Sequence, residues 1–301
     1  MTRFSSGLSS PEDLLCFLAV VDHGGFTRAA QRLGITQPAV SQSVRRLEDL
    51  LGAVLLERSA RQVKLTTAGQ AVVRDARVIV ALLGQLPEAA SGGRDGRAVV
   101  RIGAATSVVS GLIPAFLKHD QSYSYQVHAM SQDEQRAAMH NGTIDVGIGR
   151  TWNEPDFCHT LLFKEPLFAL LPEGHALAHE PRVKLSDLAQ ERFVLFERDA
   201  APVAFDAIMS ACQRAGFSPR IGQDERSEQV MSGIVAGGLG VSIIPRMASA
   251  VLTAGVVALP LTDRQAVTPL AVIAPPTDPR HLARHVAAQL REVLTLQGLA
   301  P

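Results

Sequence analysis

The sequence has little cysteine, no excess of charge of either sign and no long hydrophobic run. Its 301 residues include only three cysteines, Cys16, Cys158 and Cys212, which are odd in number and widely separated. No Cys/His cluster has the spacing of zinc ligands, so we expect no metal, no cofactor and no disulfide framework. Basic and acidic residues both total 29, so any affinity for nucleic acid must come from a local patch.

No apolar run reaches the ~20 uncharged residues that a membrane helix needs, and the opening residues MTRFSSGLSS lack the pattern of an export signal. We therefore expect a reduced, cytoplasmic protein with no membrane partner. A hydrophobic content of 47% over 301 residues predicts two or three globular domains, taking ~150 residues for each.

The stretch ITQPAVSQSVRRLEDLLG, residues 35–52, has the pattern of a helix with one buried stripe. Thr36 offers an N-cap hydroxyl, and the apolar positions Val40, Val44, Leu47 and Leu51 fall at helical spacing. The other face carries groups that read base edges and phosphates in a major groove, namely Gln37, Ser41, Gln42 and Arg45. A solvated surface helix has the same pattern, so the neighbouring elements must decide.

The neighbours of this stretch favour DNA binding. A helix is predicted from Pro11, and a second from Thr27 to the stop at Gly34, two residues before the third. Two short strands, 54–57 and 62–65, then predict a wing. Residues 28–64 hold a local basic excess, with Arg28, Arg32, Arg45, Arg46, Arg58, Arg61 and Lys64 against three acidic residues. Together they predict a winged helix-turn-helix.

The span from Leu14 to Gly69 closely resembles the DNA-binding domain of LysR-type transcriptional regulators. The resemblance is carried by FTRAAQRLGITQPAVSQSVRRLEDLLGAVLLERSARQVKLTTAG. It implies DNA contacts by Thr27, Thr36, Gln37, Pro38, Ser41, Gln42 and Arg45, with Arg58 and Arg61 at the wing. Gln42 departs from the family, in which many members carry arginine, and this leaves open which base is read there.

A helix that starts near Ala68 carries apolar residues at coiled-coil spacing. They are Val72, Ala76, Ile79, Leu83 and Leu86. Such a short seam also fits a helix that packs on its own domain. The family resemblance implies that this helix joins two subunits. A symmetric pair would place two recognition helices on an interrupted inverted repeat of double-stranded promoter DNA.

After a breaker-rich linker, PEAASGGRDG, strands alternate with helices. The pattern predicts a mostly parallel sheet, with strands at 99–103, 125–130 and 145–149 and one helix over 108–119. The resemblance, looser here, implies an effector domain of two periplasmic-binding-protein-like (type II) α/β subdomains. The fold class is therefore α/β with an N-terminal winged helix-turn-helix and a long linker helix.

The predicted boundaries are 1–66 for the winged helix-turn-helix, 67–90 for the dimerising helix, 91–97 for a hinge and 98–301 for the effector domain. Subdomain I would comprise 98–170 and 268–301, and subdomain II 171–267. The chain would cross between them near Leu171 and return near Thr268.

Ligands of open α/β sheets bind where strands end and helices begin, and the free amides there favour anions. Three such loops supply the candidate effector-binding residues Thr106, Ser107, Ser131, Gln132, Arg198 and Pro202, and Arg150, directly after the third strand, is a further candidate. Ordinary N-capping explains Ser107 and Ser131 equally well, although Ser107 matches a family position where a hydroxyl meets the effector. Arg150 is as well suited to a salt bridge. Gln132 stands where regulators of aromatic-acid catabolism often have threonine.

The sequence thus predicts a LysR-type regulator, not an enzyme, that acts as a homodimer or homotetramer and responds to a small organic or aromatic acid. RNA polymerase is a further candidate partner. A solute-binding protein or an enzyme on the same fold is the alternative, disfavoured by the missing export signal and by the lack of a nucleophile, base and orienting group. Thiol redox sensing through Cys158 and Cys212 is the third hypothesis.

Overall fold

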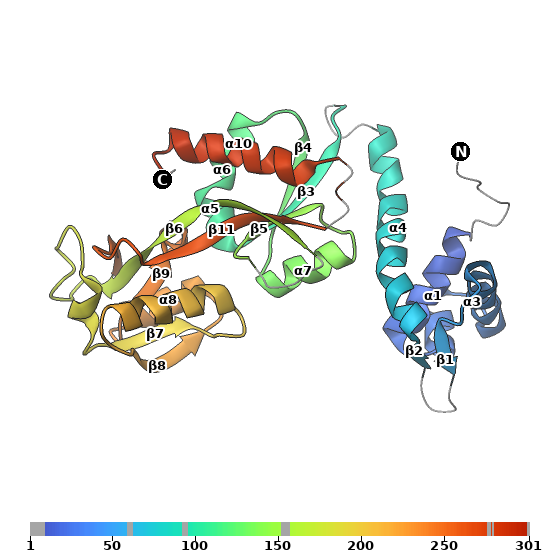
Figure 1. Ribbon diagram of the computed structural model, residues 1–301, viewed down its shortest axis with the longest axis horizontal. Coiled ribbons are helices and arrows are strands. Elements are labelled where there is room, and N and C mark those ends of the chain that lie inside the picture. Colours follow the sequence, from blue (N-terminus) through green and yellow to red (C-terminus); the bar gives the residue numbers. More distant parts are fainter. Residues whose placement is uncertain are drawn as a thin grey trace. The chain divides into compact units, whose positions relative to one another are not determined.

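The computed structural model describes residues 10–58, 63–91, 96–151, 157–275, 278 and 280–299. Two compact units make up the chain, and Figure 1 shows their elements. The first comprises Met1–Ser91 with His140–Thr143, and the second comprises Gly92–Met139 with Ile144–Pro301. No helix among the described residues is long and apolar enough to cross a membrane.

The N-terminal unit is a helix-turn-helix followed by a two-stranded wing. Its elements are α1 (Pro11–His23), α2 (Phe26–Leu33), α3 (Gln37–Leu51), the antiparallel strands β1 (Leu56–Arg58) and β2 (Val63–Leu65), and α4 (Thr67–Ser91). Gly34 ends α2 with φ of 68°, a left-handed conformation that glycine adopts without strain. Thr36 then caps α3, since its Oγ1 accepts from the backbone N–H of Ala39 at 3.4 Å. The predicted helix-turn-helix is confirmed.

Two charged contacts hold α3 in place. Nη2 of Arg46 lies 2.5 Å from Oδ1 of Asp13 on α1, and the same nitrogen donates to Oγ of Ser43 at 2.8 Å. Oε1 of Glu48 accepts from the backbone N–H of Leu55 at 2.8 Å, at the entry to the wing. The inner face of α3 also packs into the core through Val40, Val44 and Leu47. Charge-assisted hydrogen bonds and apolar packing thus fix α3 against both α1 and the wing.

The second unit begins with β3 (Val99–Ala104), α5 (Thr106–Gly111), α6 (Ile113–His119), β4 (Ser124–Ala129), α7 (Gln132–His140) and β5 (Val146–Gly149). It continues through β6 (Cys158–Pro172), the 3-10 helix η1 (Leu185–Leu188), β7 (Arg192–Phe196), α8 (Pro202–Arg214), β8 (Arg220–Glu225) and α9 (Glu228–Ala236). It ends with β9 (Ser242–Pro245), the 3-10 helix η2 (Arg246–Val251), β10 (Val256–Pro260), β11 (Val267–Ala274) and α10 (Leu282–Leu296).

The sheet of this unit is mixed, so the expectation of a mostly parallel sheet was wrong. Seven strands follow the order β10-β6-β11-β5-β3-β4, with β9 also paired to β6. The three predicted strands are parallel, since β3 pairs with both β4 and β5, while β6 and β11 pair antiparallel with all their neighbours in this sheet. The sequence pattern did not reveal β6 as a 15-residue strand. A separate parallel pair, β7 and β8, completes the unit.

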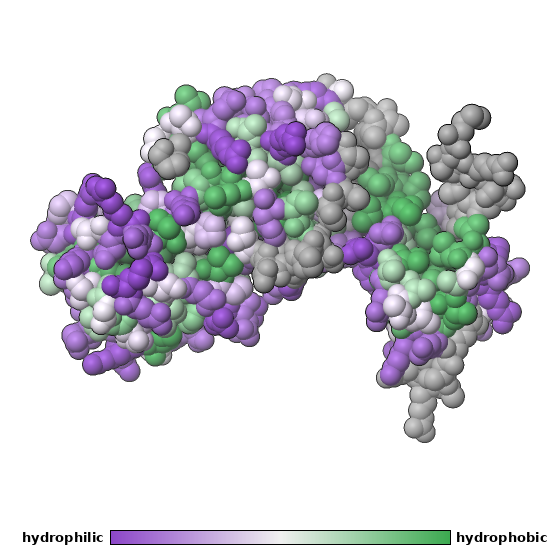
Figure 2. All heavy atoms as spheres, in the orientation of Figure 1, coloured by the Kyte–Doolittle hydropathy of each residue, from purple (hydrophilic) through white to green (hydrophobic). Residues whose placement is uncertain are grey.

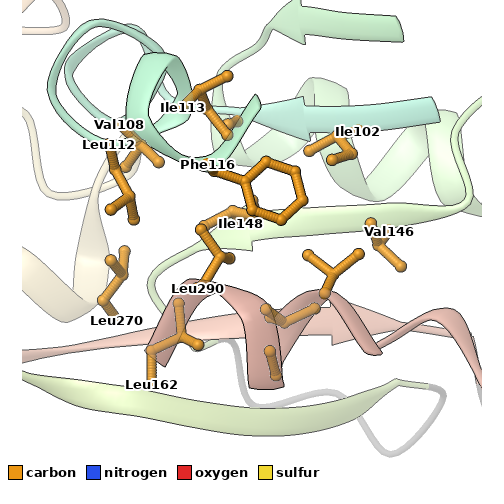
Figure 3. Packing of buried hydrophobic residues seen from close by; sticks show 14 of the residues in the cluster. Ile102, Val108, Leu112, Ile113, Phe116, Val146, Ile148, Leu162, Leu270 and Leu290 are labelled. Carbon is orange, nitrogen blue, oxygen red and sulfur yellow. The ribbon is translucent and has the colours of Figure 1, made fainter. Parts of the chain in front are cut away.

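Two large apolar cores lie along β6, and the first of them also includes residues of β11. The first surrounds Phe116 and gathers residues of β3, β5, β11 and α10, as Figure 3 shows for Ile102, Ile148 and Leu290. The second gathers residues of β7, α8, α9 and β9. Phe163 belongs to the first core and Leu167 to the second, so β6 changes core between these residues, a few positions before the predicted crossing near Leu171.

The helix predicted over 108–119 is in fact two helices. α5 ends at Gly111, Leu112 has φ of −120°, and α6 begins at Ile113 with Pro114 in its first turn. A proline inside a continuous helix would remove one backbone hydrogen bond and clash with the preceding turn, whereas the first turn tolerates it. The break therefore follows from Pro114.

A buried carboxylate ties α10 to α6 and β4. Asp120 accepts from the hydroxyl of Tyr125 at 2.5 Å, lies 2.6 Å from Nε2 of His285, and accepts from the backbone N–H of Ser122 at 2.9 Å. Burial alone would raise the pKa of Asp120, but the hydrogen bonds from Tyr125, Ser122 and His285 outweigh it and lower the pKa from 3.8 to about 2. The ionised carboxylate is thus the stable form in the fold.

Replacing Tyr125 with Phe is expected to destabilise the protein by about 1.5–3 kcal/mol at neutral pH, the usual range for a hydrogen bond to a charged group. Because the folded-state pKa of Asp120 is depressed, this contribution is present above pH 3.8 and is lost as the pH falls towards about 2. Urea unfolding at several pH values measures it. Tyr123→Phe is the control, since the described residues offer its hydroxyl no hydrogen bond, and an equal loss in both variants would contradict the assignment.

Candidate functional site

The outer face of α3 carries the side chains predicted to read DNA. Gln37, Pro38, Gln42 and Arg45 are exposed, and Ser41 is half-buried beside them. Thr27 is exposed at the start of α2, and Thr36 is exposed while its hydroxyl caps α3. Arg46, part of the predicted basic patch, is instead engaged by Asp13. The exposed amides and one guanidinium provide both donors and acceptors on a single helix face.

The wing carries the two remaining predicted DNA contacts. The backbone of Arg58 ends β1, while its side chain and the whole of Arg61 lie outside the described residues. These two contacts therefore stay predictions.

The predicted seam of α4 divides into two parts. Val72 and Ala76 pack into the core of the N-terminal unit, and Ala76 is only 1% exposed, so these two residues are not free for a partner subunit. Ile79, Leu83 and Leu86 are exposed, and Leu82 lies among them with 52% of its surface exposed. Figure 2 shows the resulting hydrophobic surface along α4. The first turns of α4 thus pack on their own domain, which is the alternative to a coiled-coil seam, while the later turns expose their apolar residues.

A cleft of about 570 Å³ opens in the second unit, where β3, β4, β5 and β7 end and α5, α7, α8 and α9 begin. Five predicted effector residues line it: Thr106, Ser107, Ser131, Gln132 and Arg150. Two do not. Arg198 pairs with Asp206 at 3.0 Å on the exposed surface, and Pro202 opens α8 without lining the cleft. Their loop contributes Ala200 and Ala201 instead.

Ser107 is buried and bonded to a residue that the sequence did not single out. Its hydroxyl donates to Oε1 of Glu228 at 2.8 Å. Glu228 is the first residue of α9, after the N-cap Ser227, and it also lines the cleft. Ser227 is an N-cap residue type before a helix, so the rule that selected the other loops, applied here, would also have included Glu228.

Ser131 and Gln132 mainly organise the loop before α7. Oγ of Ser131 accepts from the backbone N–H of Glu134 at 3.3 Å, and the Glu134 carboxylate accepts from the N–H of Ser131 at 2.7 Å. These two bonds form a capping box, which bears out N-capping by Ser131. Nε2 of Gln132 donates to the carbonyl of Arg150 at 3.2 Å and so links α7 to the end of β5.

Arg150 is held by a buried acid. Its Nη2 lies 2.6 Å from Oε2 of Glu165, whose side chain is completely buried, and Oε1 of Glu165 accepts from the backbone N–H of Met247 at 2.6 Å. Arg150 therefore forms a salt bridge, which the sequence analysis had considered as an alternative to ligand binding. Its partner, Glu165, lies on β6. Any ligand that meets Arg150 meets a guanidinium that is already neutralised.

Burial raises the pKa of Glu228 above its usual 4.5. The hydrogen bond from Ser107 and the positive charge of Arg150 oppose that rise, and the negative charge of Glu165 adds to it. The carboxyl group of Glu228 thus takes up a proton at a higher pH than an exposed glutamate. An acid whose pKa is raised inside a cleft is a candidate binding residue.

The three cysteines differ in their exposure. Cys16 and Cys212 are buried, and burial raises the pKa of Cys212 to about 12, which disfavours the reactive thiolate. Cys158 is exposed, and all three thiols are free.

Among the described residues, no group of three His, Cys, Asp or Glu side chains could hold a metal ion.

A winged helix-turn-helix in the same chain as an α/β unit whose cleft is lined by hydroxyl, amide and charged side chains defines a DNA-binding regulator with its own ligand-binding unit. Comparison with known families agrees. Residues 11–70 match the bacterial regulatory helix-turn-helix protein of the lysR family, and residues 93–295 match the LysR substrate binding domain. The chain belongs to the LysR family of transcriptional regulators, which are not enzymes.

Relatives of similar length support this assignment. The uncharacterized HTH-type transcriptional regulator YnfL of Escherichia coli is 34% identical over 86% of this chain and 90% of its own. BenM of Acinetobacter baylyi is 30% identical over 84% and 86%. The solved structure of full-length CbnR complexed with its target DNA has a TM-score of 0.67 and 26% identity, and covers 94% of this chain and 99% of that one.

Replacing Arg150 with Met is expected to destabilise the protein by about 3–5 kcal/mol, because it leaves the charge of Glu165 buried and unpaired. Chemical denaturation measures the loss. The double variant Arg150→Met with Glu165→Gln should recover most of it, since the amide oxygen can still accept from Met247 while the charge is gone. A single variant as stable as the natural protein would refute the buried pair.

Proposed function

We propose that this regulator binds promoter DNA as a homo-oligomer through α3 and the wing, and that a small organic or aromatic acid in the cleft modulates it. The observation that carries the proposal is the cleft itself, at the start of four helices and in the same chain as a winged helix-turn-helix. Helix N-termini favour anions through their free amides and dipole.

The proposed DNA contacts are those predicted from the sequence. They are Thr27, Thr36, Gln37, Pro38, Ser41, Gln42 and Arg45, with Arg58 and Arg61 at the wing. The exposed outer face of α3 and the family's helix-turn-helix match support them. The CbnR structure, described as complexed with its target DNA, adds a relative that binds DNA with this fold.

We further propose that α4 forms the subunit contact through Ile79, Leu82, Leu83 and Leu86. Their exposure supports this role, because apolar side chains gathered on one helix face gain free energy when a partner covers them. A two-fold pair would address an interrupted inverted repeat. We also propose that the protein is a dimer or a tetramer, that it contacts RNA polymerase and that it is located in the cytoplasm. The proposed domain boundaries are 1–66, 67–90, 91–97 and 98–301.

The proposed effector contacts are Thr106, Ser107, Ser131, Gln132 and Arg150, now joined by Glu228. α5 and α7 contribute to the cleft from β3 and β4, whereas α8 and α9 follow β7 and β8. β6 connects the core on which α5 packs with the core on which α8 and α9 pack. An effector that touches both sides favours the arrangement in which it makes most contacts, and only that preference can shift the conformational equilibrium.

If α3 reads bases, Gln42→Ala relaxes the preference for a DNA site selected by the natural protein, while the salt dependence of binding stays the same. Arg45→Ala lowers affinity, and it flattens the slope of log K against log salt by about 0.9 if Arg45 neutralises one phosphate. Fluorescence anisotropy at several salt concentrations measures both. Lys118→Ala, which removes an exposed charge from the second unit, is the control. Unchanged binding by both α3 variants would overturn the assignment.

If the cleft binds an organic acid, a thermal-shift screen with benzoate and short aliphatic acids finds a stabilising ligand. At about 100 times its Kd such a ligand adds about 2.7 kcal/mol. Ser107→Ala should reduce the shift, because Ser107 lines the cleft. Arg198→Ala should leave it unchanged, because Arg198 lies outside the cleft. Equal shifts in both variants would place the ligand elsewhere.

A further inference from the structure

The carboxylate of Glu228 has acceptor capacity that the protein does not use. Its Oε1 accepts the hydroxyl of Ser107 at 2.8 Å, and no other hydrogen bond to its side chain is present among the described residues. An ionised carboxylate can accept about four hydrogen bonds. Glu228 lines the cleft, so the remaining acceptor positions are available to a bound molecule.

The cations of the cleft are engaged by other acids. Arg150 pairs with Glu165 at 2.6 Å, and Arg226 pairs with Glu197 at 3.2 Å on the exposed rim. Over the part of the chain that the structure describes, no Lys, Arg or His lies within ion-pair distance of Glu228. A plain monocarboxylate that entered the cleft would add a negative charge near Glu228, which forms no ion pair among the described residues.

We infer that the effector carries a hydrogen-bond donor, a hydroxyl or an ammonium group, in addition to its carboxylate, and that Glu228 accepts this donor. The inference rests on the proposed effector cleft. The carboxylate end can meet the hydroxyl of Thr106 and the backbone amides of Gln132 and Asp133 at the start of α7, because these residues also line the cleft. The ligand class is therefore a hydroxy acid or an amino acid.

The state of Glu228 gives this arrangement a dependence on pH. Burial raises its pKa, so the carboxyl group becomes neutral at a higher pH than an exposed glutamate does. A plain acid should then bind better as the pH falls and the repulsion disappears. An ammonium-bearing ligand should bind better as the pH rises and Glu228 ionises. The facing charged groups are Arg150 and Glu165, and the facing hydroxyl is that of Ser107.

Isothermal titration of the full-length protein with matched sets of acids tests the inference. The sets are phenylacetate, mandelate and phenylglycine, then butyrate, 3-hydroxybutyrate and 3-aminobutyrate, then benzoate, 4-hydroxybenzoate and 4-aminomethylbenzoate. In at least one set, the best donor-bearing member should bind at least tenfold more tightly than the plain acid. Glu228→Leu should abolish that preference and strengthen binding of the plain acid.

Glu228→Gln separates the two donors, because the amide keeps an acceptor oxygen but loses the charge. It should keep the preference for a hydroxyl and lose that for an ammonium group, and it decides the outcome if the Leu variant does not fold. Asp206→Asn is the matched control, since Asp206 is an acid that pairs with Arg198 at 3.0 Å and does not line the cleft. It should leave both preferences intact.

The outcomes separate this inference from the proposed function. Plain acids that bind the natural protein as tightly as their donor-bearing partners would overturn the inference and leave the effector cleft standing. A preference that persists in Glu228→Leu would also overturn it, since another group would then accept the donor. Failure of every member of every set to bind would overturn the proposed small-acid response itself.

Discussion

A completely buried carboxylate, Glu165, sets a constraint on which much of the second unit depends. It lies on β6 between Phe163 of one core and Leu167 of the other. Such a charge must be paired and hydrogen-bonded to be tolerated, and here Arg150 and the backbone of Met247 satisfy it. The end of β5, the start of η2 and the passage of β6 between the cores are thereby fixed together beneath the cleft.

The N-terminal unit also contains a buried carboxylate that is paired with an arginine. Asp13 is almost fully buried, and its pairing with Arg46 joins α1 to α3. Glu48 joins α3 to the wing through the amides of Leu55 and Leu56. These residues face inward and keep α3 rigid, while its amides and Arg45 face outward. A helix that reads DNA needs this division, because base recognition depends on side chains held in a defined position.

Local elements could be predicted wherever the sequence carried a short-range signal. The helix start at Pro11, the N-cap Thr36 and the stop at Gly34 predicted the helix-turn-helix, and strand and helix alternation predicted the ends of β3, β4 and β5. β8 was missed because RIGQDE has almost no strand-forming residues, and pairing with β7 alone makes it a strand. The antiparallel course of β6 and β11 was missed because sheet order is a property of long-range pairing.

The family, the helix-turn-helix with its outward face and the loops that end the strands could all be recognised from the sequence alone. These features depend on hydrogen bonds and periodicities among residues that are close together in the chain, so a short stretch of sequence is enough to reveal them. Which side chains meet in the cleft could be learned only from the tertiary structure. In the folded protein, Ser107 contacts Glu228, 121 positions away, Arg150 pairs with Glu165, and Arg198 lies outside the cleft. These contacts depend on how the two cores pack along β6, and the spacing of residues in the sequence does not predict that packing.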